Sequence, residues 1–316
     1  MSVGVAHRGR YAWIALCLGL ALAGCGGSDD SSGGDPATDK LAQIVARGTI
    51  IGFFEPDYAP QSLAVEGAAR PADTKCNDAQ LTGAEVTGYD IEMTKLLAEA
   101  LGVEPCFVSP PWTEVTSGNW GDRWDIAYGS GAITADRMER LFMTRPYYAT
   151  ANRYFVQKDS AFQRPSDLDG KKIGVCVSCS QEAYLKGELE LPGTEVVVDV
   201  KSPEIVVFEV EGPGFAALEK GTVDAFLAGD PVGQAIIDDG AAVRPLEAVA
   251  FSEYLSGFVD RSSGLEAAAF VAKVDEVVQE LLDDGTLKTL SLEWFKTDYA
   301  TPAADFDLDD LGQDIE

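Results

Sequence analysis

Residues 88–102 read GYDIEMTKLLAEALG, and this stretch indicates which class of fold the chain adopts. The apolar side chains in it recur with the spacing of one helix face: Met93, Leu96, Leu97, Ala100 and Leu101. Gly102 follows directly, where a glycine commonly ends a helix. A short apolar strand is then predicted at 106–108. A helix that leads at once into a short buried strand favours an α/β architecture.

The same alternation continues on both sides of this stretch. Further strands are predicted at 50–54, 125–128, 154–156, 172–177, 194–200 and 224–227. Further helices are predicted at 41–45, ending at Gly48, from about 181, at 215–220, and across 270–281 with Gly285 as the C-cap. Residues 66–84 lack periodicity and are interpreted as a surface insertion. We therefore expect largely parallel sheets.

The N-terminus has the composition of a secretory signal. Two arginines precede an apolar run at 12–23, which is shorter than the about 20 apolar residues that a membrane-spanning helix needs. The next residues, Leu22-Ala23-Gly24-Cys25, resemble the lipobox of bacterial lipoproteins, which implies cleavage before Cys25 and a lipid on its thiol. We expect 1–24 to be a signal peptide and 25–38 a lipidated flexible tether. The protein would then be exported, in the periplasm or anchored to the outer face of the cell membrane.

The charge balance argues against one large class of function. The chain has 24 basic and 52 acidic residues, and its formal net charge is −28. Nucleic acids are bound through basic patches that displace counterions from phosphates, so we expect no nucleic-acid partner. The apolar content of 46% is typical of a globular protein. We interpret the acidity as a surface property that favours solubility, and we expect membrane contact through the lipid only.

Four cysteines remain after the signal and the lipid-bearing cysteine are set aside: Cys76, Cys106, Cys176 and Cys179. An even number in an exported protein favours disulfides. Four cysteines allow three pairings, of which we favour Cys76–Cys106 and Cys176–Cys179. The alternative for the second pair is a redox-active motif, which the surrounding sequence does not support because no thioredoxin-like βαβ pattern encloses it.

The single histidine of the chain, His7, lies in the predicted signal peptide. The mature chain would contain none, which excludes Ser-His-Asp and Cys-His catalysis and the usual histidine-based zinc sites. We therefore predict no catalytic residue, no metal and no cofactor.

Seven segments, taken in order, resemble the bacterial extracellular solute-binding proteins of family 3, the amino-acid-binding group. The segments are 40–48 with 50–52, GYDI at 88–91 with 97–102, WDI at 124–126 leading into GAITADR at 131–137, Tyr147, LDGKKIGV at 168–175, GTVDA at 221–225 and DGTL at 284–287. Each segment is short, but their order behind a lipobox is specific. The resemblance covers about residues 40 to 298.

The resemblance implies a two-lobed periplasmic-binding-protein-like fold of type II, with two α/β lobes joined by two hinge strands. Lobe 1 is expected from 39–153 plus 253–298, and lobe 2 from 154–252. Residues 299–316 would form an acidic C-terminal tail, which we expect to be disordered from 305 onward. The ligand would lie between the lobes, at the carboxyl ends of the strands, where α/β sheets generally bind their ligands.

The resemblance also implies a set of ligand-binding residues. Arg137 matches the arginine that grips a ligand carboxylate, which a guanidinium does with two parallel hydrogen bonds. Ser180 matches a second-lobe hydroxyl that donates to the same carboxylate, and Asp230 resembles the aspartate that holds the ligand ammonium. Ser130 and Ala132 occupy positions whose backbone groups meet the ligand. The structural alternatives are a surface ion pair for the arginine, a helix N-cap for the serine at 180 and a turn for the aspartate.

Three further residues complete the predicted site. Tyr58 and Trp112 match the two aromatic walls around a ligand side chain, and their alternative is ordinary packing within a lobe. Glu55 falls where relatives that bind basic amino acids place a carboxylate. This position favours a cationic or polar ligand.

The function implied by the resemblance is the capture of an amino acid or a similar small polar solute. A monomer would pass this solute to the permease of an ABC transporter. One alternative is a periplasmic enzyme on the same fold, similar to the cyclohexadienyl dehydratases, in which Glu55, Glu182 or Asp230 would act as acid or base. A second alternative is a sensory lobe of a receptor kinase, which the lipobox and the lack of a membrane-helix sequence oppose.

Overall fold

The computed structural model describes residues 34–56, 58–313 and 315. The predicted signal peptide, Cys25 and most of the predicted tether lie outside the described residues. Within the described part, no helix is both long enough and apolar enough to cross a bilayer.

Helices and strands alternate along the chain, as the sequence predicts. The helices are α1 (Lys40–Arg47), α2 (Tyr89–Leu101), α3 (Trp112–Ser117), α4 (Ala135–Met138), α5 (Ser180–Lys186), α6 (Glu211–Glu219), α7 (Asp230–Asp238), α8 (Ala268–Asp283) and α9 (Thr286–Phe295), with the short 3-10 helices η1 (Pro165–Leu168), η2 (Thr301–Asp305) and η3 (Leu308–Leu311). The strands are β1 (Thr49–Phe53), β2 (Leu63–Ala64), β3 (Leu81–Thr82), β4 (Val86–Thr87), β5 (Glu104–Val108), β6 (Ala127–Ala132), β7 (Leu141–Gln157), β8 (Lys172–Cys176), β9 (Glu204–Phe208), β10 (Ala225–Gly229), β11 (Val243–Pro245) and β12 (Phe251–Asp260).

Two long antiparallel strands, β7 and β12, hold the larger sheet together. The strand order of this sheet is β6-β12-β7-β10-β8-β9, and β11 also pairs with β7. The paired residues of β7 and β12 run from Leu141↔Asp260 to Asn152↔Phe251. Beyond that point β7 pairs with β10, and β10 and β9 flank β8 in parallel. A second sheet has the order β1-β5-β3, in which β1 and β5 are parallel.

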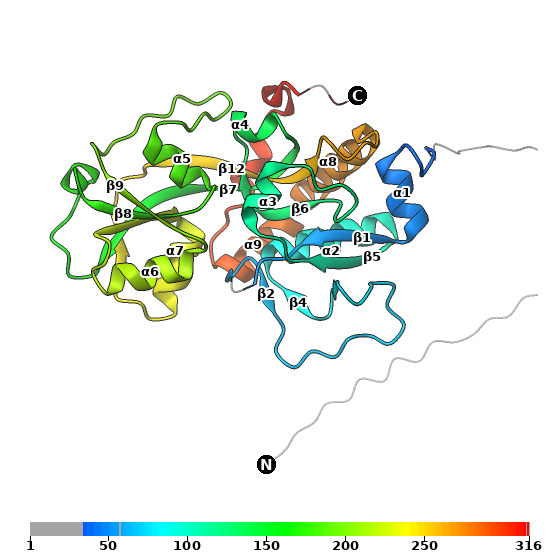
Figure 1. Ribbon diagram of the computed structural model, residues 1–316, viewed down its shortest axis with the longest axis horizontal. Helices are drawn as coiled ribbons and strands as arrows, with labels where there is room; N and C mark the ends of the chain where they lie inside the picture. The colour runs from blue at the N-terminus through cyan, green and yellow to red at the C-terminus, as the bar shows by residue number, and fades with distance from the viewer. Residues whose placement is uncertain (1–33, 57, 314, 316) are drawn as a thin grey trace, which may run out of the picture. The chain divides into compact units, whose positions relative to one another are not determined.

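The apolar core divides into two groups that meet at β7 and β12 (Figure 1). The first group, here called lobe 1, has its buried core residues within 44–148 and 255–311. The second group, here called lobe 2, has them within 154–251. Lobe 1 is therefore formed by segments that precede and follow lobe 2 in the sequence. The two connections between the lobes are β7 and β12.

Helix α2 shows why the opening stretch of the sequence predicts its structure well. Gly88 precedes the helix with φ of 127°, and a Cβ atom there would lie 2.2 Å from the Gln61 carbonyl oxygen, so only glycine fits. Met93 and Leu97 are buried in the core of lobe 1. Gly102 ends the helix in the left-handed conformation with φ of 66°.

The expectation of largely parallel sheets is wrong for the larger sheet, where β7 and β12 pair antiparallel with each neighbour. Two details of the predicted secondary structure are wrong as well. Residues 194–200 form no strand, and the next strand after β8 along the chain is β9 at Glu204–Phe208, which pairs with β8. Both segments are rich in β-branched residues, so intrinsic propensity does not decide between them, whereas the ladder with β8 does. Gly285 does not cap α8, because this helix ends at Asp283 with Asp284 as its cap, and Gly285 instead precedes α9.

The C-terminal residues are ordered as far as they are described, so the predicted disorder of the tail is wrong there. Phe306 and Leu311 are buried against the core of lobe 1. The Gln313 side chain accepts a hydrogen bond of 3.0 Å from the Met143 backbone N–H and donates one to the Met143 carbonyl. Apolar side chains at these positions outweigh the acidic composition on which the prediction rested.

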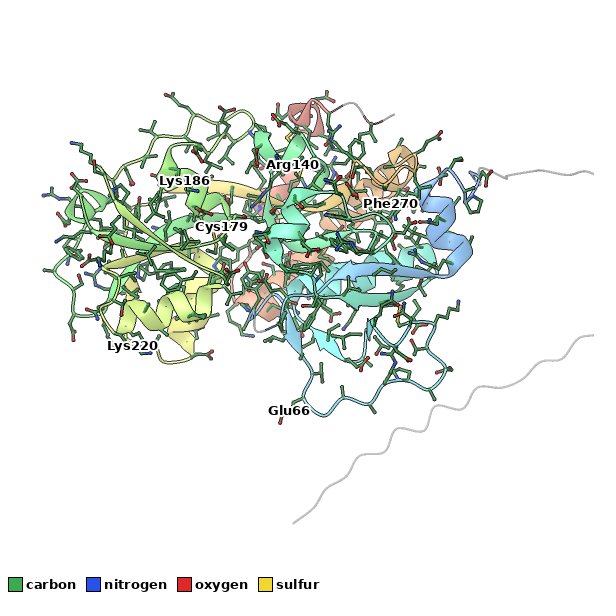
Figure 2. All side chains as sticks on the ribbon, in the orientation of Figure 1. Glu66, Arg140, Cys179, Lys186, Lys220 and Phe270 are labelled. Atoms are coloured by element: carbon green, nitrogen blue, oxygen red, sulfur yellow. A yellow bond between two sulfur atoms is a disulfide. The ribbon has the colours of Figure 1, made fainter. Side chains whose placement is uncertain are left out.

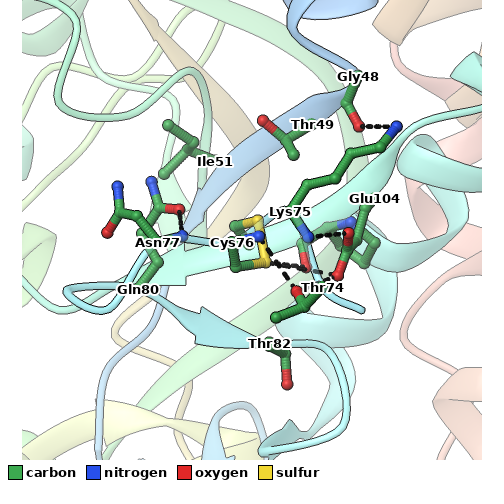
Figure 3. Close-up of a disulfide and its surroundings, with 12 residues drawn as sticks. Gly48, Thr49, Ile51, Thr74, Lys75, Cys76, Asn77, Gln80, Thr82 and Glu104 are labelled. Carbon is green, nitrogen blue, oxygen red and sulfur yellow. Dashed lines mark hydrogen bonds between the residues drawn. A yellow bond between two sulfur atoms is a disulfide. The ribbon is translucent and has the colours of Figure 1, made fainter. Parts of the chain in front are cut away.

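A disulfide fixes the predicted surface insertion to the sheet of lobe 1. Cys76 is bonded to Cys106 of β5, and their Cα atoms are 5.5 Å apart (Figure 3). The backbone N–H of Lys75 donates to the Glu104 carboxylate at 2.8 Å, and the Lys75 ammonium lies 3.5 Å from the Gly48 carbonyl oxygen. The insertion is thus attached to the edge of lobe 1 by a covalent bond and by polar contacts.

Candidate ligand-binding site

A cavity lies between the two lobes, beside the strands that join them. Lobe 1 and β12 contribute Glu55, Tyr58, Trp112, Gly129, Ser130, Ala132, Arg137 and Glu253 to its wall. Lobe 2 contributes Cys176, Val177, Cys179, Ser180, Gln181, Glu209 and Glu211. Cys179 lies at this junction in Figure 2. Seven of the eight predicted ligand-binding residues therefore meet in one place, although they are spread over 126 positions of the chain from Glu55 to Ser180.

Arg137 is the basic residue of the cavity wall, and it is only 5% exposed. Helix α4 carries it, with Thr134 as N-cap accepting the Arg137 backbone N–H at 3.2 Å. The guanidinium donates to the Ala132 carbonyl and to the Ser178 carbonyl, each at 2.9 Å. Burial lowers the pKa of Arg137 to about 10, so it stays protonated at neutral pH. These two bonds use two of the five donors of a guanidinium.

Two aromatic rings lie close to the Arg137 guanidinium. It lies 5.5 Å from the centroid of Trp112 and 5.6 Å from that of Phe258, within the range of cation–π attraction. Trp112 also reaches lobe 2, since its indole N–H donates to the Ser178 carbonyl at 3.3 Å. Tyr58 packs against the core of lobe 2 from the other lobe. Both predicted aromatic walls thus contact both sides of the cavity.

The loop that carries Ser178 is held in a fixed shape. A disulfide joins Cys176 to Cys179, with Cα atoms 5.6 Å apart. Between them Ser178 adopts a positive φ of 55°, and its N–H donates to the Glu182 carboxylate at 2.7 Å. These constraints turn the Ser178 carbonyl toward Arg137 and Trp112 of lobe 1.

Ser130 is held by a buried carboxylate behind it. Its hydroxyl donates to Asp90 at 2.8 Å, and its backbone N–H donates to the Tyr147 hydroxyl at 3.0 Å. Tyr147 in turn donates to Asp90 at 2.6 Å. Burial raises the pKa of Asp90 to about 7, against the effect of the two hydroxyl groups. This network fixes Ser130 in a left-handed backbone conformation, with φ of 51°.

The cavity is strongly acidic. Four glutamates but a single arginine line it. Burial raises the pKa of Glu55 to about 8, and the charges of Glu211 and Asp90 raise it further. Burial also raises the pKa of Glu211 to about 7. Buried carboxyl groups that resist ionisation form a favourable site for a cationic group, because its charge offsets the cost of ionising them.

The structure places Asp230 outside this cavity, and its role as a ligand-binding residue stays a prediction. Its carboxylate pairs with Arg153, with 3.0 Å between Nε and Oδ1. The register of β10 and β7 explains this pairing, because Ala228 lies opposite Arg153 just before Asp230 begins α7. The side chain lies near Tyr299 in a different hollow on the chain.

The sequence analysis missed four polar residues of the cavity wall: Gln181, Glu209, Glu211 and Glu253. Glu253 is the most buried of the glutamates, 5% exposed, and lies on the joining strand β12. None of the family motifs includes these positions. The signal that could have indicated Glu253 is a lone acidic residue within an otherwise apolar strand, FSEYLSGFV at 251–259.

Comparison with known proteins places this geometry in a family. The model of the bacterial extracellular solute-binding proteins, family 3, matches residues 62–297. The chain belongs to this family. Its members are extracytoplasmic solute-binding proteins, and the family prediction from the sequence is thereby confirmed.

Individual relatives agree with the assignment. The L-cystine-binding protein TcyJ of Escherichia coli (strain K12) is 24% identical over 93% of this chain and 98% of its own length. The arginine-binding extracellular protein ArtP of Bacillus subtilis is 24% identical over 89% of this chain and 95% of its own length. These relatives are binding proteins, not enzymes.

Solved structures confirm the two-lobed fold. The amino acid ABC transporter substrate-binding protein AbpA of Streptococcus pneumoniae, bound to L-arginine, has a TM-score of 0.65 and 22% identity, over 81% of this chain and 98% of its own. At this level of identity the likeness carries the fold alone.

Proposed function

We propose that this family member is an exported lipoprotein that captures an α-amino acid with a cationic side chain and delivers it to the permease of an ABC importer. One observation carries the proposal. The cavity wall contains one arginine, Arg137. It also contains two carboxyl groups, Glu55 and Glu211, whose charges interact with each other. Of the carboxyl groups that line the cavity, Glu253 is the one whose charge acts on Arg137.

The proposed binding mode assigns one part of the ligand to Arg137 and another to Glu55 and Glu211. Arg137 binds the ligand carboxylate with its remaining donors, and Ser180 donates to the same group. Tyr58 and Trp112 enclose the side chain. The cationic end of the side chain lies between Glu55 and Glu211, where it favours the ionised form of both carboxyl groups.

We further propose how the chain moves and where it works. The moving bodies are 39–153 plus 253–298 and 154–252, and β7 and β12 hinge them. Residues 1–24 are removed on export, Cys25 carries the lipid ahead of the tether at 25–38, and the protein acts as a monomer without catalytic activity, metal or cofactor. The lipobox resemblance and the family membership support this arrangement.

The alternative of an enzyme on the same fold has fewer residues left to support it. Of its three candidate acids and bases, Asp230 pairs with Arg153, and Glu182 is bonded to the Ser178 N–H and to Lys186. Glu55 alone of the three lines the cavity. Incubation with prephenate or arogenate should yield no product, and product formation that depends on Glu55 would establish the enzyme instead.

Isothermal titration calorimetry with L-arginine and L-citrulline tests the proposed function. Citrulline has nearly the same shape, but its side chain is uncharged. We expect arginine to bind at least tenfold more tightly, about 1.4 kcal/mol or more. Replacing Glu55 and Glu211 by glutamine together should remove this preference. Equal affinity of the wild type for both ligands would reject the cationic ligand class, and no binding of any amino acid in a thermal-shift screen would reject the proposed function.

A further inference from the structure

Glu253 lines the cavity and has a buried oxygen atom without a hydrogen-bond partner among the described residues. The residue lies on β12 opposite Thr150 of β7, lines the cavity and is 5% exposed. Its Oε1 accepts a hydrogen bond of 2.9 Å from the Asn152 amide. Its Oε2 is buried and has no hydrogen-bond partner among the described residues. A buried carboxylate oxygen without a hydrogen bond costs free energy, and the Ser180 hydroxyl, which favours the ionised carboxylate, is bonded to Gln181 instead.

The neighbours of Glu253 keep its carboxylate in place. The Asn152 side-chain oxygen accepts from Gln181 of lobe 2 at 2.5 Å, and Gln181 accepts from the Ser180 hydroxyl at 3.3 Å. Burial raises the pKa of Glu253, while Ser180, Asn152 and the charge of Arg137 lower it. Among the charged groups that stabilise protonated Arg137, Glu253 has the largest effect. The strand pairing places the two residues near each other, because Leu255, two residues further along β12, lies opposite Ala132, whose carbonyl accepts from Arg137.

The covalent structure of an amino acid limits where its ammonium can be bound. The ammonium nitrogen and the carboxylate carbon are attached to the same carbon atom, so the nitrogen lies about 3 Å from a carboxylate oxygen. A group that neutralises the ammonium must lie near the group that holds the carboxylate. Glu55 and Glu211 interact with each other, Asp90 is bonded to Ser130 and Tyr147, and Asp230 is bonded to Arg153.

We infer that Glu253 binds the α-ammonium of the ligand through Oε2, in the role that the sequence analysis gave to Asp230. The inference rests on the proposed function, because it requires that Arg137 holds the carboxylate of an α-amino acid. It adds that selection for the α-amino group occurs on the joining strand β12. Asn152 and Gln181 are positioning residues, which connect this carboxylate to lobe 2.

The experiment compares each amino acid with its deaminated analogue. L-Arginine and 5-guanidinopentanoate, and L-histidine and imidazolepropionate, are titrated into the wild type, Glu253→Gln and Glu253→Asp. The wild type should prefer the amino acids at least 30-fold. Glu253→Gln should lose roughly 30-fold or more for the amino acids, as expected when one member of a buried charge pair is removed, and less than threefold for the deaminated analogues. Glu253→Asp keeps the charge and should keep part of the preference.

A matched control is Glu99→Gln, the same substitution at an exposed position of α2. It should bind every ligand as the wild type does. Equal losses for both members of a ligand pair in Glu253→Gln would show a merely structural role and overturn the inference. Unchanged amino-acid affinity in that variant would overturn it too, as expected if a protonated Glu253 donates to the ligand carboxylate. A wild type that binds no amino acid in the thermal-shift screen would overturn the proposed function itself, and the inference with it. If the glutamine variant does not fold, Glu253→Asp and the wild-type preference still decide the inference.

Discussion

The Arg137 guanidinium donates a hydrogen bond of 2.9 Å to the Ser178 carbonyl, across the cavity between the lobes. The same guanidinium holds the Ala132 carbonyl of its own lobe at 2.9 Å. One side chain therefore serves both as a link between the lobes and as the basic group of the candidate site. A ligand carboxylate bound by this side chain would act directly on the contact between the lobes.

Replacing Arg137 by alanine should almost abolish ligand binding. Removal of one member of a buried, hydrogen-bonded charge pair typically costs about 2–5 kcal/mol, or roughly 30- to several-thousand-fold in affinity. Arg137→Lys should restore only part of it, because an ammonium lacks the two-pronged geometry. Tyr58→Ala should cost less, about 1–3 kcal/mol, since it removes apolar contact and no charge. Calorimetry measures the three affinities, and wild-type affinity in Arg137→Ala would contradict the assignment.

The disulfide between Cys176 and Cys179 should affect ligand affinity more than stability. It fixes the loop whose Ser178 carbonyl meets Arg137 and Trp112. Serine at both positions should free this loop and weaken binding by about tenfold, since binding must then order it.

The second disulfide provides the matched control. Serine at both Cys76 and Cys106 opens a bond with a sequence separation of 30, and neither cysteine lines the cavity. It should lower the free energy of unfolding by about 2–4 kcal/mol and leave the affinity unchanged. Denaturation measures the stability of both double variants, and calorimetry measures their ligand affinity. Equal losses of affinity in the two variants would contradict the prediction.

Binding of a cationic ligand should depend on pH through Glu55 and Glu211. Their pKa values are raised to about 8 and about 7, so both are largely protonated at pH 6 and ionise toward pH 8.5. Affinity for arginine should therefore rise about tenfold or more over this range, with release of protons, and affinity for citrulline should not. Titration in buffers of different ionisation enthalpy detects the released protons. A flat profile for arginine would contradict the role of these two groups.

The same pKa shifts give the sign of a stability effect in the unliganded protein. The folded state holds these protons up to about pH 7 to 8, whereas an unfolded glutamate loses its proton near its ordinary pKa of 4.5. The contribution is fully present below pH 4.5 and is lost as the pH rises through the folded values. The wild type should therefore lose more stability between pH 5 and pH 8.5 than the variant with glutamine at both positions. Urea denaturation measures this difference.

Cys25→Ser tests the proposed anchor. The variant should appear in the soluble exported fraction and take up no labelled fatty acid, because no thiol remains for the lipid. Cys17→Ser, within the predicted signal peptide, is the control and should leave labelling intact. A wild type without label, together with a membrane-bound variant, would contradict the lipoprotein assignment.

Much of the fold could be predicted because local and global signals agree. Helix α2 has an apolar face, a glycine before it and a glycine after it, and all three features are properties of the sequence itself. The choice between 194–200 and β9 could not be predicted, since both segments suit a strand and only the pairing with β8 separates them. The buried tail residues Phe306 and Leu311 likewise depend on a surface that forms only in the folded protein.

The residues of the site also divide into those that could be predicted from the sequence and those that could not. The positions that match family motifs, such as Arg137 and Ser180, reach the cavity as expected. Asp230 does not, because a salt bridge with Arg153 of the neighbouring strand holds it elsewhere. Glu253 is distant in sequence from every motif, and the pairing of β12 with β7 and β6 brings it to the cavity wall. Motif transfer finds residues whose local setting is retained, and it misses those placed by strand register.

The insertion of lobe 2 through two paired strands has a mechanical consequence. Both ends of the described chain pack on lobe 1, and β7 and β12 pair from Leu141↔Asp260 to Asn152↔Phe251. Tension applied between the chain ends reaches this ladder at its Leu141 end and must open it pair by pair, like a zipper. Lobe 2 lies beyond the last pair, so it is shielded from the pulling force until the ladder has come apart.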